Sequence, residues 1–572
     1  MKTKKLFYLF VILLVTVSAA NAQEKARKID ELMKSYYDYG QFNGAVLVAE
    51  KGQVVYKKGF GMANMEWEIQ NQTDTKFRIG SVTKQFTATL ILQLVEEGKI
   101  KLDGKLSDYL PDYRKDTGDK ITVHQLLNHT SGIPSYTNQP DFFANVSRNP
   151  YKPADFVKKY ASGDLEFAPG TKFKYNNSGY FLLGAIIEQV TGKSYETVLR
   201  ERILEPLGMT KSGYDNYAPL IKKRAEGYEK TPDGYVNAAY LDMSLPYAAG
   251  SMYSTVEDLY KWDQSLYENK IISAASKKLM FTPGLSDYGY GFEITDRPLG
   301  KTAEKIKIIQ HGGGINGFNC LLTRLVDRQQ TIILLDNVGL GQYQGNITNS
   351  IVNILNNQPF DPPKKSIGDA LHKIAMEKGG AAAVAEYRKL KSEKPETYDF
   401  SESELNTLGY QFVRANRAKD AIEVFKLNVE MFPKSANPYD SLGEAYLADN
   451  QKELALANYK KAVELDPSNA NARQIVNRLE GKETKINRAV FDFYVGDYEL
   501  APNFVLTVTK EDDKLFGQAT GQGKLELEPV SETQFAIPAV NATVSFEKDA
   551  AGKVVGLTLL QNGQAIKGKK IK

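Results

Sequence analysis

The chain has 572 residues, too many for one hydrophobic core, so its length predicts two to four domains. Hydrophobic residues make up 42% of it and charged residues 25%, which indicates a globular protein and argues against a disordered one. The formal net charge of +4 offers no concentrated basic face of the kind that nucleic acids require, so we expect no nucleic-acid partner.

The first 22 residues have the three-part pattern of a secretory signal. Lysines at positions 2, 4 and 5 precede an apolar run, Leu6–Val17, and small residues end the segment at Ala22. We expect cleavage there and export to the periplasm or the cell exterior. No later apolar run is long enough to cross a bilayer, so no membrane span is expected after cleavage.

Cys320 is the only cysteine, so no disulfide can form within the chain, and we interpret it as a small buried side chain. The four histidines are His124, His129, His311 and His372. None of them forms the helical pair with a nearby carboxylate that a catalytic zinc site needs. We therefore expect neither a metal nor another cofactor.

Strand patterns at both ends of the first 355 residues flank a helical middle. A helix is expected over 28–39, followed by a hairpin of strands 44–49 and 54–57. This order predicts an α+β domain whose antiparallel sheet is assembled from its N-terminal and C-terminal pieces. The other expected helices span 81–97, 123–127, 179–191 and 195–203, and the other expected strands span 290–294, 307–310, 321–325 and 331–335.

After this domain the paired prolines Pro362 and Pro363 mark a linker, and a helix is expected over 370–391. Two stretches then repeat at an offset of 34 residues and resemble tetratricopeptide repeats, which could dock a protein partner. The preceding helix would serve as a degenerate repeat or cap. The matching pairs are Leu408-Gly409 with Leu442-Gly443, Ala421 with Ala455, Phe425 with Tyr459, and Pro433 with Pro467.

The last part of the chain alternates polar and apolar residues and predicts a small all-β domain, either an antiparallel barrel or a sandwich. Its strands are expected over 504–508, 525–527, 542–546 and 554–559. The predicted divisions are 1–22 for the signal, 23–357 for the α+β domain, 358–400 for the linker and helix, 401–486 for the repeats and 487–572 for the β domain.

Ser81-Val82-Thr83-Lys84 places a hydroxyl and an amine one helical turn apart. An alcohol is a weak nucleophile and needs a neighbour that takes its proton, and Lys84 has the required spacing. The first turn of a helix also favours a developing negative charge. The same spacing recurs at Ser545 and Lys548 in a predicted hairpin, so the motif alone is weak, and a solvated helix start is the simpler interpretation.

Tyr175-Asn176-Asn177 lies on a loop just before a predicted helix. The pKa of a tyrosine beside a lysine cation can be lowered enough for it to act as a general base, and Asn177 can hold the lysine or a substrate amide. The alternative is that Tyr175 only packs its ring against the protein.

His311-Gly312-Gly313-Gly314 directly follows a strand pattern. Glycines at a strand edge let a substrate backbone approach, and a free N–H there can complete an oxyanion hole with the N–H of Ser81. A phosphate-binding loop is the poorer interpretation, because no Gly-Lys-Ser/Thr follows.

In this order, Ser81-x-x-Lys84, Tyr175-x-Asn177 and His311-x-Gly313 resemble the motifs of the class C β-lactamase and D-alanyl-D-alanine peptidase superfamily. The resemblance covers roughly residues 30–355. It implies a β-lactamase/transpeptidase-like fold and acyl transfer through a serine ester. Other matching strings are Leu126 to Gly132, Pro206 to Met209 and Ala249 to Thr255.

The resemblance also implies a role for each matching residue. Ser81 would be the acylated nucleophile, Lys84 would assist the removal of its proton, and Tyr175 would activate the water that releases the acyl group. The remaining positions would bind substrate: Asn177 would orient it, His311 and Gly313 would line the strand beside it, and Ser81 and Gly314 would supply the oxyanion N–H groups.

One departure from the family pattern bears on the substrate. Members that recognise β-lactams usually carry Lys-Thr-Gly at the third motif, where a cation and a hydroxyl hold a substrate carboxylate. Here His311 is expected to be mostly neutral at pH 7, and Gly312 has no hydroxyl. We expect a serine hydrolase acting on an ester, an amide or a peptide with a D-residue. The alternatives are a true β-lactamase and a penicillin-binding sensor or partner-docking protein with slow or no turnover.

Overall fold

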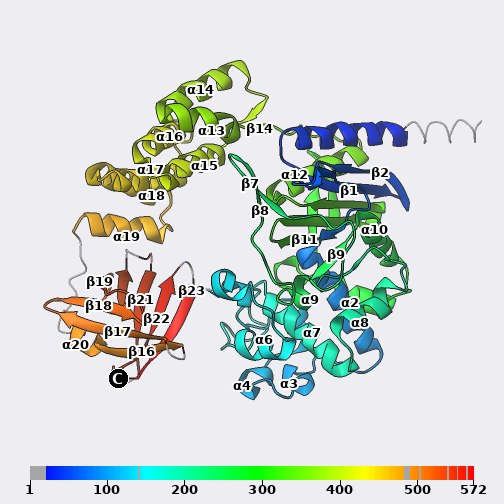
Figure 1. Ribbon diagram of the computed structural model, residues 1–572, viewed down its shortest axis with the longest axis horizontal. Helices are drawn as coiled ribbons and strands as arrows, with labels where there is room; N and C mark the ends of the chain where they lie inside the picture. Colours follow the sequence, from blue (N-terminus) through cyan, green and yellow to red (C-terminus); the bar gives the residue numbers. More distant parts are fainter. Residues whose placement is uncertain are drawn as a thin grey trace, which may run out of the picture. The chain divides into compact units, whose positions relative to one another are not determined.

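The computed structural model describes residues 21–139, 142–481, 490–501, 504–537, 540, 542–549, 552–561 and 564–571. Most of the predicted signal, residues 1–20, lies outside the described residues. The chain divides into two compact units, one up to Pro363 and one from Lys364 (Figure 1). Within the described ranges, no helix has both the length and the hydropathy needed to cross a membrane.

A six-stranded antiparallel sheet in the order β10-β11-β12-β13-β1-β2 forms the centre of the first unit. The predicted N-terminal hairpin is β1 (Gly44–Glu50) and β2 (Gln53–Phe60). β1 pairs directly with β13 (Gln330–Asp336), so the two ends of the unit meet in one sheet and the expected α+β arrangement is confirmed. The remaining strands are β10 (Glu293–Pro298), β11 (Lys305–Ile315) and β12 (Phe318–Leu325).

Helices cover both faces of this sheet, because its strands turn alternate apolar side chains to opposite sides. On one face, Val46 and Val48 share a core with the helical residues 21–38 and with α12 (Gly341–Leu355). On the other face, Ala45 and Leu47 belong to the core that contains the helices around the candidate site. Those helices include α2 (Thr83–Glu96), α5 (Val123–Leu127), α7 (Asn177–Thr191), α8 (Tyr195–Leu199) and α9 (Tyr247–Gly250).

Two predicted boundaries around the site were wrong. Ser81 lies in a separate 3-10 turn, η1 (Gly80–Val82), that leads into α2, and not in the first turn of that helix. The glycine run 312–314 lies inside β11 and not after it, because β11 continues to pair with β12 as far as Ile315 and Phe318. The strand therefore continues through three glycines. Because glycine has no side chain, the alternation of polar and apolar residues could not be followed there in the sequence.

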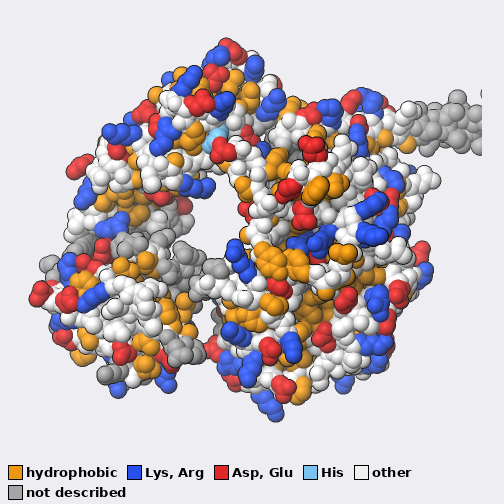
Figure 2. All heavy atoms as spheres, viewed as in Figure 1, with side chains coloured by type: hydrophobic (Ala, Val, Ile, Leu, Met, Phe, Trp, Pro, Cys, Tyr) orange, Lys and Arg blue, Asp and Glu red, His pale blue; other side chains and the backbone are white. Residues whose placement is uncertain are grey.

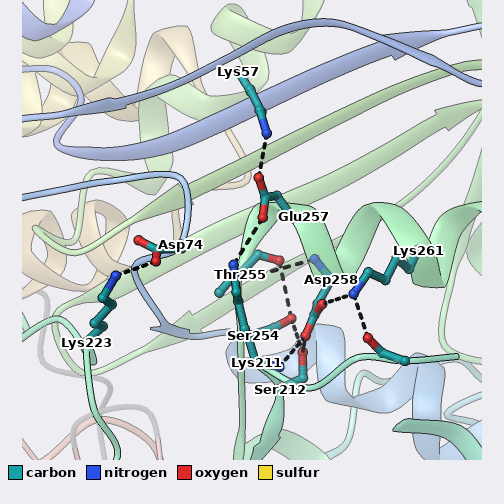
Figure 3. A network of polar contacts seen from close by, with 11 residues as sticks. Lys57, Asp74, Lys211, Ser212, Lys223, Ser254, Thr255, Glu257, Asp258 and Lys261 are labelled. Atoms are coloured by element: carbon teal, nitrogen blue, oxygen red, sulfur yellow. Dashed lines mark hydrogen bonds and ion pairs between the residues drawn. The ribbon is translucent and has the colours of Figure 1, made fainter. Parts of the chain in front are cut away.

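A network of polar contacts anchors the strand that precedes α10 (Val256–Ser265), as Figure 3 shows. The buried carboxylate of Asp258 accepts hydrogen bonds from the Ser212 hydroxyl at 2.9 Å and from the backbone N–H of Lys211 at 2.7 Å. The Ser212 hydroxyl also lies 2.7 Å from that of Ser254, the last residue of β9. β9 (Met252–Ser254) pairs with β5 (Phe77–Arg78), which leads to Ser81, so the network supports the segment that positions Ser81.

The second unit begins with packed helix pairs. At positions 34 residues apart, a side chain added at Gly409 would meet the Phe425 ring at 2.3 Å, and one at Gly443 would meet the Tyr459 ring at 2.9 Å. Each pair therefore depends on a glycine that lets an aromatic ring approach. The pairs are α15 (Glu402–Arg414) with α16 (Ala418–Met431) and α17 (Ala436–Ala448) with α18 (Lys452–Leu465), and α19 (Ala470–Leu479) follows them.

The prediction of one helix over 370–391 was wrong. Two helices, α13 (Ile367–Lys378) and α14 (Gly380–Glu393), occupy this stretch. They are separated at Gly379, whose φ of +92° is compatible with a glycine and interrupts the helical backbone. The apolar periodicity continues through the break, and this continuity suggested a single helix.

The C-terminal strands close into an eight-stranded barrel, so the expected all-β region is present and takes the form of a barrel. Its core is filled by apolar and aromatic side chains, among them Tyr498, Phe535 and Phe546. The strands are β16 (Gly496–Ala501), β17 (Phe504–Glu511), β18 (Lys514–Ala519), β19 (Leu525–Pro529), β20 (Gln534–Ile537), β21 (Ala542–Lys548), β22 (Val554–Gln561) and β23 (Gln564–Lys570).

The close approach of β11 to the turn before α2 depends on one particular glycine. A side chain at Gly313 would begin 2.1 Å from the carbonyl oxygen of Ile79 and 2.7 Å from the sulfur of Cys320. A side chain at the neighbouring Gly312 would find its nearest atom at 3.7 Å, which is ordinary contact. Gly313 thus holds the strand against the residues that precede Ser81.

We expect Gly313→Ala to destabilise the protein by about 1–3 kcal/mol, because the added methyl group must push β11 away from Ile79. Gly312→Ala is the matched control and should unfold close to the wild-type temperature. Thermal unfolding followed by circular dichroism measures both variants. Equal melting temperatures for the two variants would show that the close approach is not needed.

Candidate active site

The structure brings the first two sequence motifs together around one amine. Lys84 Nζ lies 3.0 Å from Ser81 Oγ and donates a hydrogen bond to Asn177 Oδ1 at 2.8 Å. The same nitrogen lies 4.9 Å from the centre of the Tyr175 ring. An alcohol, an amine and a phenol from two parts of the chain therefore meet in one place, as acyl transfer through a serine requires.

The surroundings of Lys84 favour its neutral form. Its side chain is fully buried, and none of the ion pairs of the described residues includes it. Burial lowers the pKa of Lys84 well below its ordinary value of 10.5. The carbonyl oxygens of Asn177 and of Ala249, at 2.8 and 2.9 Å, accept two N–H bonds, so the lone pair of a neutral Lys84 can face the Ser81 hydroxyl.

Glycine geometry sets the position of Ser81. Gly80 has a φ of +48°, and a side chain there would lie 3.0–3.1 Å from the backbone of Gly314 on β11. The turn and the strand therefore approach each other next to Ser81. The backbone of Gly314 thus lies beside Ser81. This is consistent with the prediction that the N–H groups of these two residues form an oxyanion hole.

The loop before α7 presents Tyr175. Asn176 caps this helix by accepting the N–H of Gly179 at 2.9 Å, and its own N–H donates to His129 Nδ1 at 3.1 Å. The Tyr175 ring packs on the His129 ring with centres 4.4 Å apart, and 36% of the residue remains exposed. His129 therefore packs against one side of the tyrosine ring, and part of the residue is exposed to solvent.

The expected lowering of the Tyr175 pKa was wrong. Burial of its surroundings raises the pKa above the ordinary value of 10.0, and the Ser81 hydroxyl offsets only part of this. The expectation relied on a charged lysine, whereas desolvation favours a neutral Lys84. Tyr175 therefore stands as a phenol that can donate a proton, and Lys84 is the group that can accept one.

His311 is held in its neutral form next to Tyr175, whose ring centre lies 6.1 Å away. Its Nδ1 lies 2.5 Å from the carbonyl oxygen of Gly312, which can only accept, so Nδ1 carries the proton. Its Nε2 then accepts from the Tyr288 hydroxyl at 2.8 Å. Burial is the main cause that lowers the pKa of His311 to about 3.

Further groups support these residues: sequence reasoning placed His129 as a packing residue near the site but missed Tyr288 and the backbone of Ala249. The His129 ring packs between Tyr175 and two further tyrosines, Tyr180 and Tyr288, with ring centres 5.2 and 4.6 Å away. Ala249 acts through its backbone carbonyl, so its side chain gave no signal. The only available hint was that His129 and Ala249 lie in strings that resemble the superfamily.

A cavity of about 120 Å³ lies beside Ser81. Of the predicted substrate-binding residues, Asn177 and Gly314 line it. His311 and Gly313 do not: His311 is turned to Tyr288, and Gly313 faces the Ile79 carbonyl. In this structure these two residues support the strand and the aromatic cluster, and their expected place on the strand beside a substrate stays a prediction.

Charge does not concentrate on the face of the protein seen in Figure 2, where positive and negative side chains alternate. Within the described part of the chain, no group of three or more His, Cys, Asp or Glu side chains is arranged to hold a metal ion. Cys320 is buried, and its thiol donates to the Ile79 carbonyl at 2.9 Å.

The site's motifs lie within a region that matches a known family. Residues 26–342, more than half of the chain, match the family model described as beta-lactamase. The chain belongs to the β-lactamase family. Residues 481–570, which include the barrel, match a domain of unknown function, DUF3471.

Individual members of the β-lactamase family resemble the chain over much of their length. PbpX of Bacillus subtilis, which carries the name of a penicillin-binding protein, is 32% identical over 344 residues, 60% of this chain and 83% of its own. A teichoic acid D-alanine hydrolase of Staphylococcus aureus is 32% identical over 276 residues, 47% of this chain and 65% of its own. The crystal structure of a penicillin-binding protein from Bacillus halodurans has 28% identity and a TM-score of 0.50, covering 55% of this chain and 96% of that one.

The lowered pKa of Lys84 predicts the pH dependence of Ser81 acylation in this β-lactamase-family protein. Only the neutral amine can take the serine proton, so the rate should fall as the pH drops through the pKa of Lys84, well below 10.5. Single-turnover labelling by a fluorophosphonate at a series of pH values measures it. A midpoint at the ordinary lysine value would contradict the buried neutral amine.

The same labelling compares Lys84→Ala with Lys99→Ala. We expect about a 100- to 10,000-fold loss of labelling rate for the first, because it removes the proton acceptor. Lys99, whose side chain is half exposed, is the control and should leave the rate unchanged.

The lowered pKa of His311 predicts a loss of stability in acid. An unfolded histidine takes up a proton near pH 6.5 while the folded one resists it down to about 3. The stabilisation present above pH 6.5 is therefore lost as the pH falls toward 3, by at most about 1.4 kcal/mol per pH unit. Urea unfolding from pH 7.5 to 4.5 should show a shallower pH dependence for His311→Gln than for the wild type. Equal slopes would show that His311 takes up its proton in the folded state.

Proposed function

We propose that this protein is an exported serine hydrolase that forms an acyl-enzyme on Ser81 and transfers the acyl group to water. The substrate is an ester, an amide or a peptide with a D-residue. One observation carries the proposal: a buried lysine, with its pKa lowered, lies 3.0 Å from the Ser81 hydroxyl. Membership of a family of serine hydrolases supports it.

In the first step, neutral Lys84 takes the Ser81 proton while Oγ attacks the substrate carbonyl carbon. The backbone N–H groups of Ser81 and Gly314 stabilise the negative oxygen that forms. Tyr175 donates its proton to the leaving atom as the bond to carbon breaks, and the proton on Lys84 then replaces the one that Tyr175 gave. The step ends with an ester on Ser81, a released alcohol or amine, and a neutral lysine.

In the second step, water attacks this ester. Tyr175 takes a proton from the water as it passes its own to Lys84, and the hydroxide attacks the ester carbon. The bond to Ser81 Oγ breaks, and the oxygen recovers a proton from Lys84. The free acid leaves, and all three side chains return to their starting forms.

The third motif supports esters, amides and D-residue peptides over penicillins. Neutral His311 and Gly312 offer neither a cation nor a hydroxyl for a substrate carboxylate. The relative named as a teichoic acid D-alanine hydrolase acts on a D-residue, which supports this substrate class. A true β-lactamase remains the alternative if nitrocefin is hydrolysed faster than esters, and a penicillin-binding sensor if a penicillin adduct persists.

The other parts of the chain carry proposals of their own. The segment 1–22 acts as a signal for export, supported by its lysines and apolar run. The paired helices of the second unit form tetratricopeptide-type repeats that dock a protein partner, supported by the offset of 34 residues and by the two glycine contacts that recur with it.

We expect a fluorophosphonate to label Ser81 and a nitrophenyl ester to be hydrolysed. Ser81→Ala should lose the label and at least about 1,000-fold in hydrolysis, because it removes the hydroxyl that lies 3.0 Å from the Lys84 amine. Ser545→Ala is the matched control, since it has the same Ser-x-x-Lys spacing on a barrel strand. Mass spectrometry of the adduct and ester kinetics measure both. Label on another residue would overturn the proposal.

A further inference from the structure

The cavity beside Ser81 is lined mainly by apolar and aromatic side chains. Its described lining contains six large apolar or aromatic side chains and no Lys, Arg, His, Asp or Glu. Hydrophobic side chains also gather near the middle of the first unit in Figure 2. The six are Tyr136, Phe142, Phe143, Leu241, Leu245 and Ile315.

The positions of Tyr175 and Lys84, which move protons in the proposed mechanism, indicate which part of a substrate enters this cavity. The leaving atom must lie next to the hydroxyl that protonates it, which is Tyr175 in the proposed mechanism. Tyr175 and Lys84 do not line the cavity, whereas Ser81 and Gly314 do. The cavity therefore lies away from the leaving group and next to the carbonyl carbon. The part of the substrate that stays on Ser81 occupies it.

The size and polarity of the cavity limit that part of the substrate. Its volume of about 120 Å³ is close to the ~150 Å³ of an apolar protein cavity that binds benzene, so it has room for about one ring or one branched alkyl group. A carboxylate there would lose its water without meeting a cation, at a large cost in binding free energy. Asn177 is also placed to hold an amide: one N–H of its Nδ2 donates to Thr137 at 3.1 Å, and the second remains for a substrate.

We infer that the enzyme selects substrates whose acyl group is uncharged and carries one aromatic or branched aliphatic group. This inference rests on the proposed function. It narrows the proposed substrate class by stating which acyl groups the enzyme accepts. Phe143 is the residue that sets the preference at the mouth of the cavity, since 57% of it is exposed and a bound ring would cover it.

The test uses the full chain and three p-nitrophenyl esters that share one leaving group: the acetate, the phenylacetate and the hemisuccinate. Each kcat/KM is divided by the rate of hydrolysis by hydroxide, so that intrinsic reactivity cancels. We expect the phenylacetate to exceed the acetate by about tenfold or more and the hemisuccinate to be the poorest substrate. Equal corrected values, or a preference for the hemisuccinate, would overturn the inference.

Two variants locate the preference. Phe143→Lys should lower the phenylacetate-to-hemisuccinate ratio at least tenfold, because it replaces a ring by a cation at the cavity mouth. Leu220→Lys makes the same kind of change on a residue that is 95% exposed and outside the cavity lining, and should leave the ratio unchanged. An unchanged ratio in Phe143→Lys, in protein that still labels at Ser81, would also overturn the inference.

The two proposals fail in different ways. If no ester is hydrolysed and Ser81 takes no label, the proposed function fails. If all three esters are hydrolysed in a manner that depends on Ser81 but without the expected order, hydrolysis stands and the acyl preference falls.

Discussion

The site depends on an amine that the protein keeps away from both water and carboxylates. A lysine normally holds its proton tightly, and a carboxylate partner would strengthen that hold. Around Lys84 the protein supplies uncharged oxygen acceptors and aromatic rings instead, including the Tyr180 ring 5.5 Å from Nζ. These groups fix the direction of the amine without stabilising its charge enough to offset burial. In the proposed mechanism, this lysine thereby acts as a base for the weakly acidic serine hydroxyl.

The surrounding fold keeps this arrangement rigid. Ser81 and Lys84 are close in sequence, but the groups that complete the site come from the loop before α7, from α9 and from β11. They are held by a sheet that is covered on both faces and by glycines that permit contacts shorter than any side chain allows. A small displacement of β11 would move the backbone N–H of Gly314, which the proposed mechanism uses to stabilise the negative oxygen, so the packing behind the strand would affect that step.

Sequence patterns predicted much of this architecture and of the reacting residues. The order of strands around a helical middle was enough to place β1 beside the C-terminal strands, and motif spacing was enough to bring Ser81, Lys84, Tyr175 and Asn177 together. Other features could not be read in the same way. Glycines carry no polarity signal, so β11 seemed to stop at Gln310 and α13 seemed to continue through Gly379. The direction of the Tyr175 pKa shift depends on burial in three dimensions, and the carbonyl of Ala249 leaves no mark in the residue type.

The pairing of β1 with β13 has a consequence for how the protein acquires its structure. The backbone N–H of Asn43 donates to the carboxylate of Asp336, across a sequence separation of 293 residues. Contacts between such distant residues must overcome a large loop-closure entropy, and domains rich in them fold slowly. A chain emerging from its N-terminus would leave the β13-facing edge of β1 unpaired until residues 330–336 became available. That exposed edge is open to pairing with other chains, so this stage of synthesis is the one at which a folding helper would be of most use.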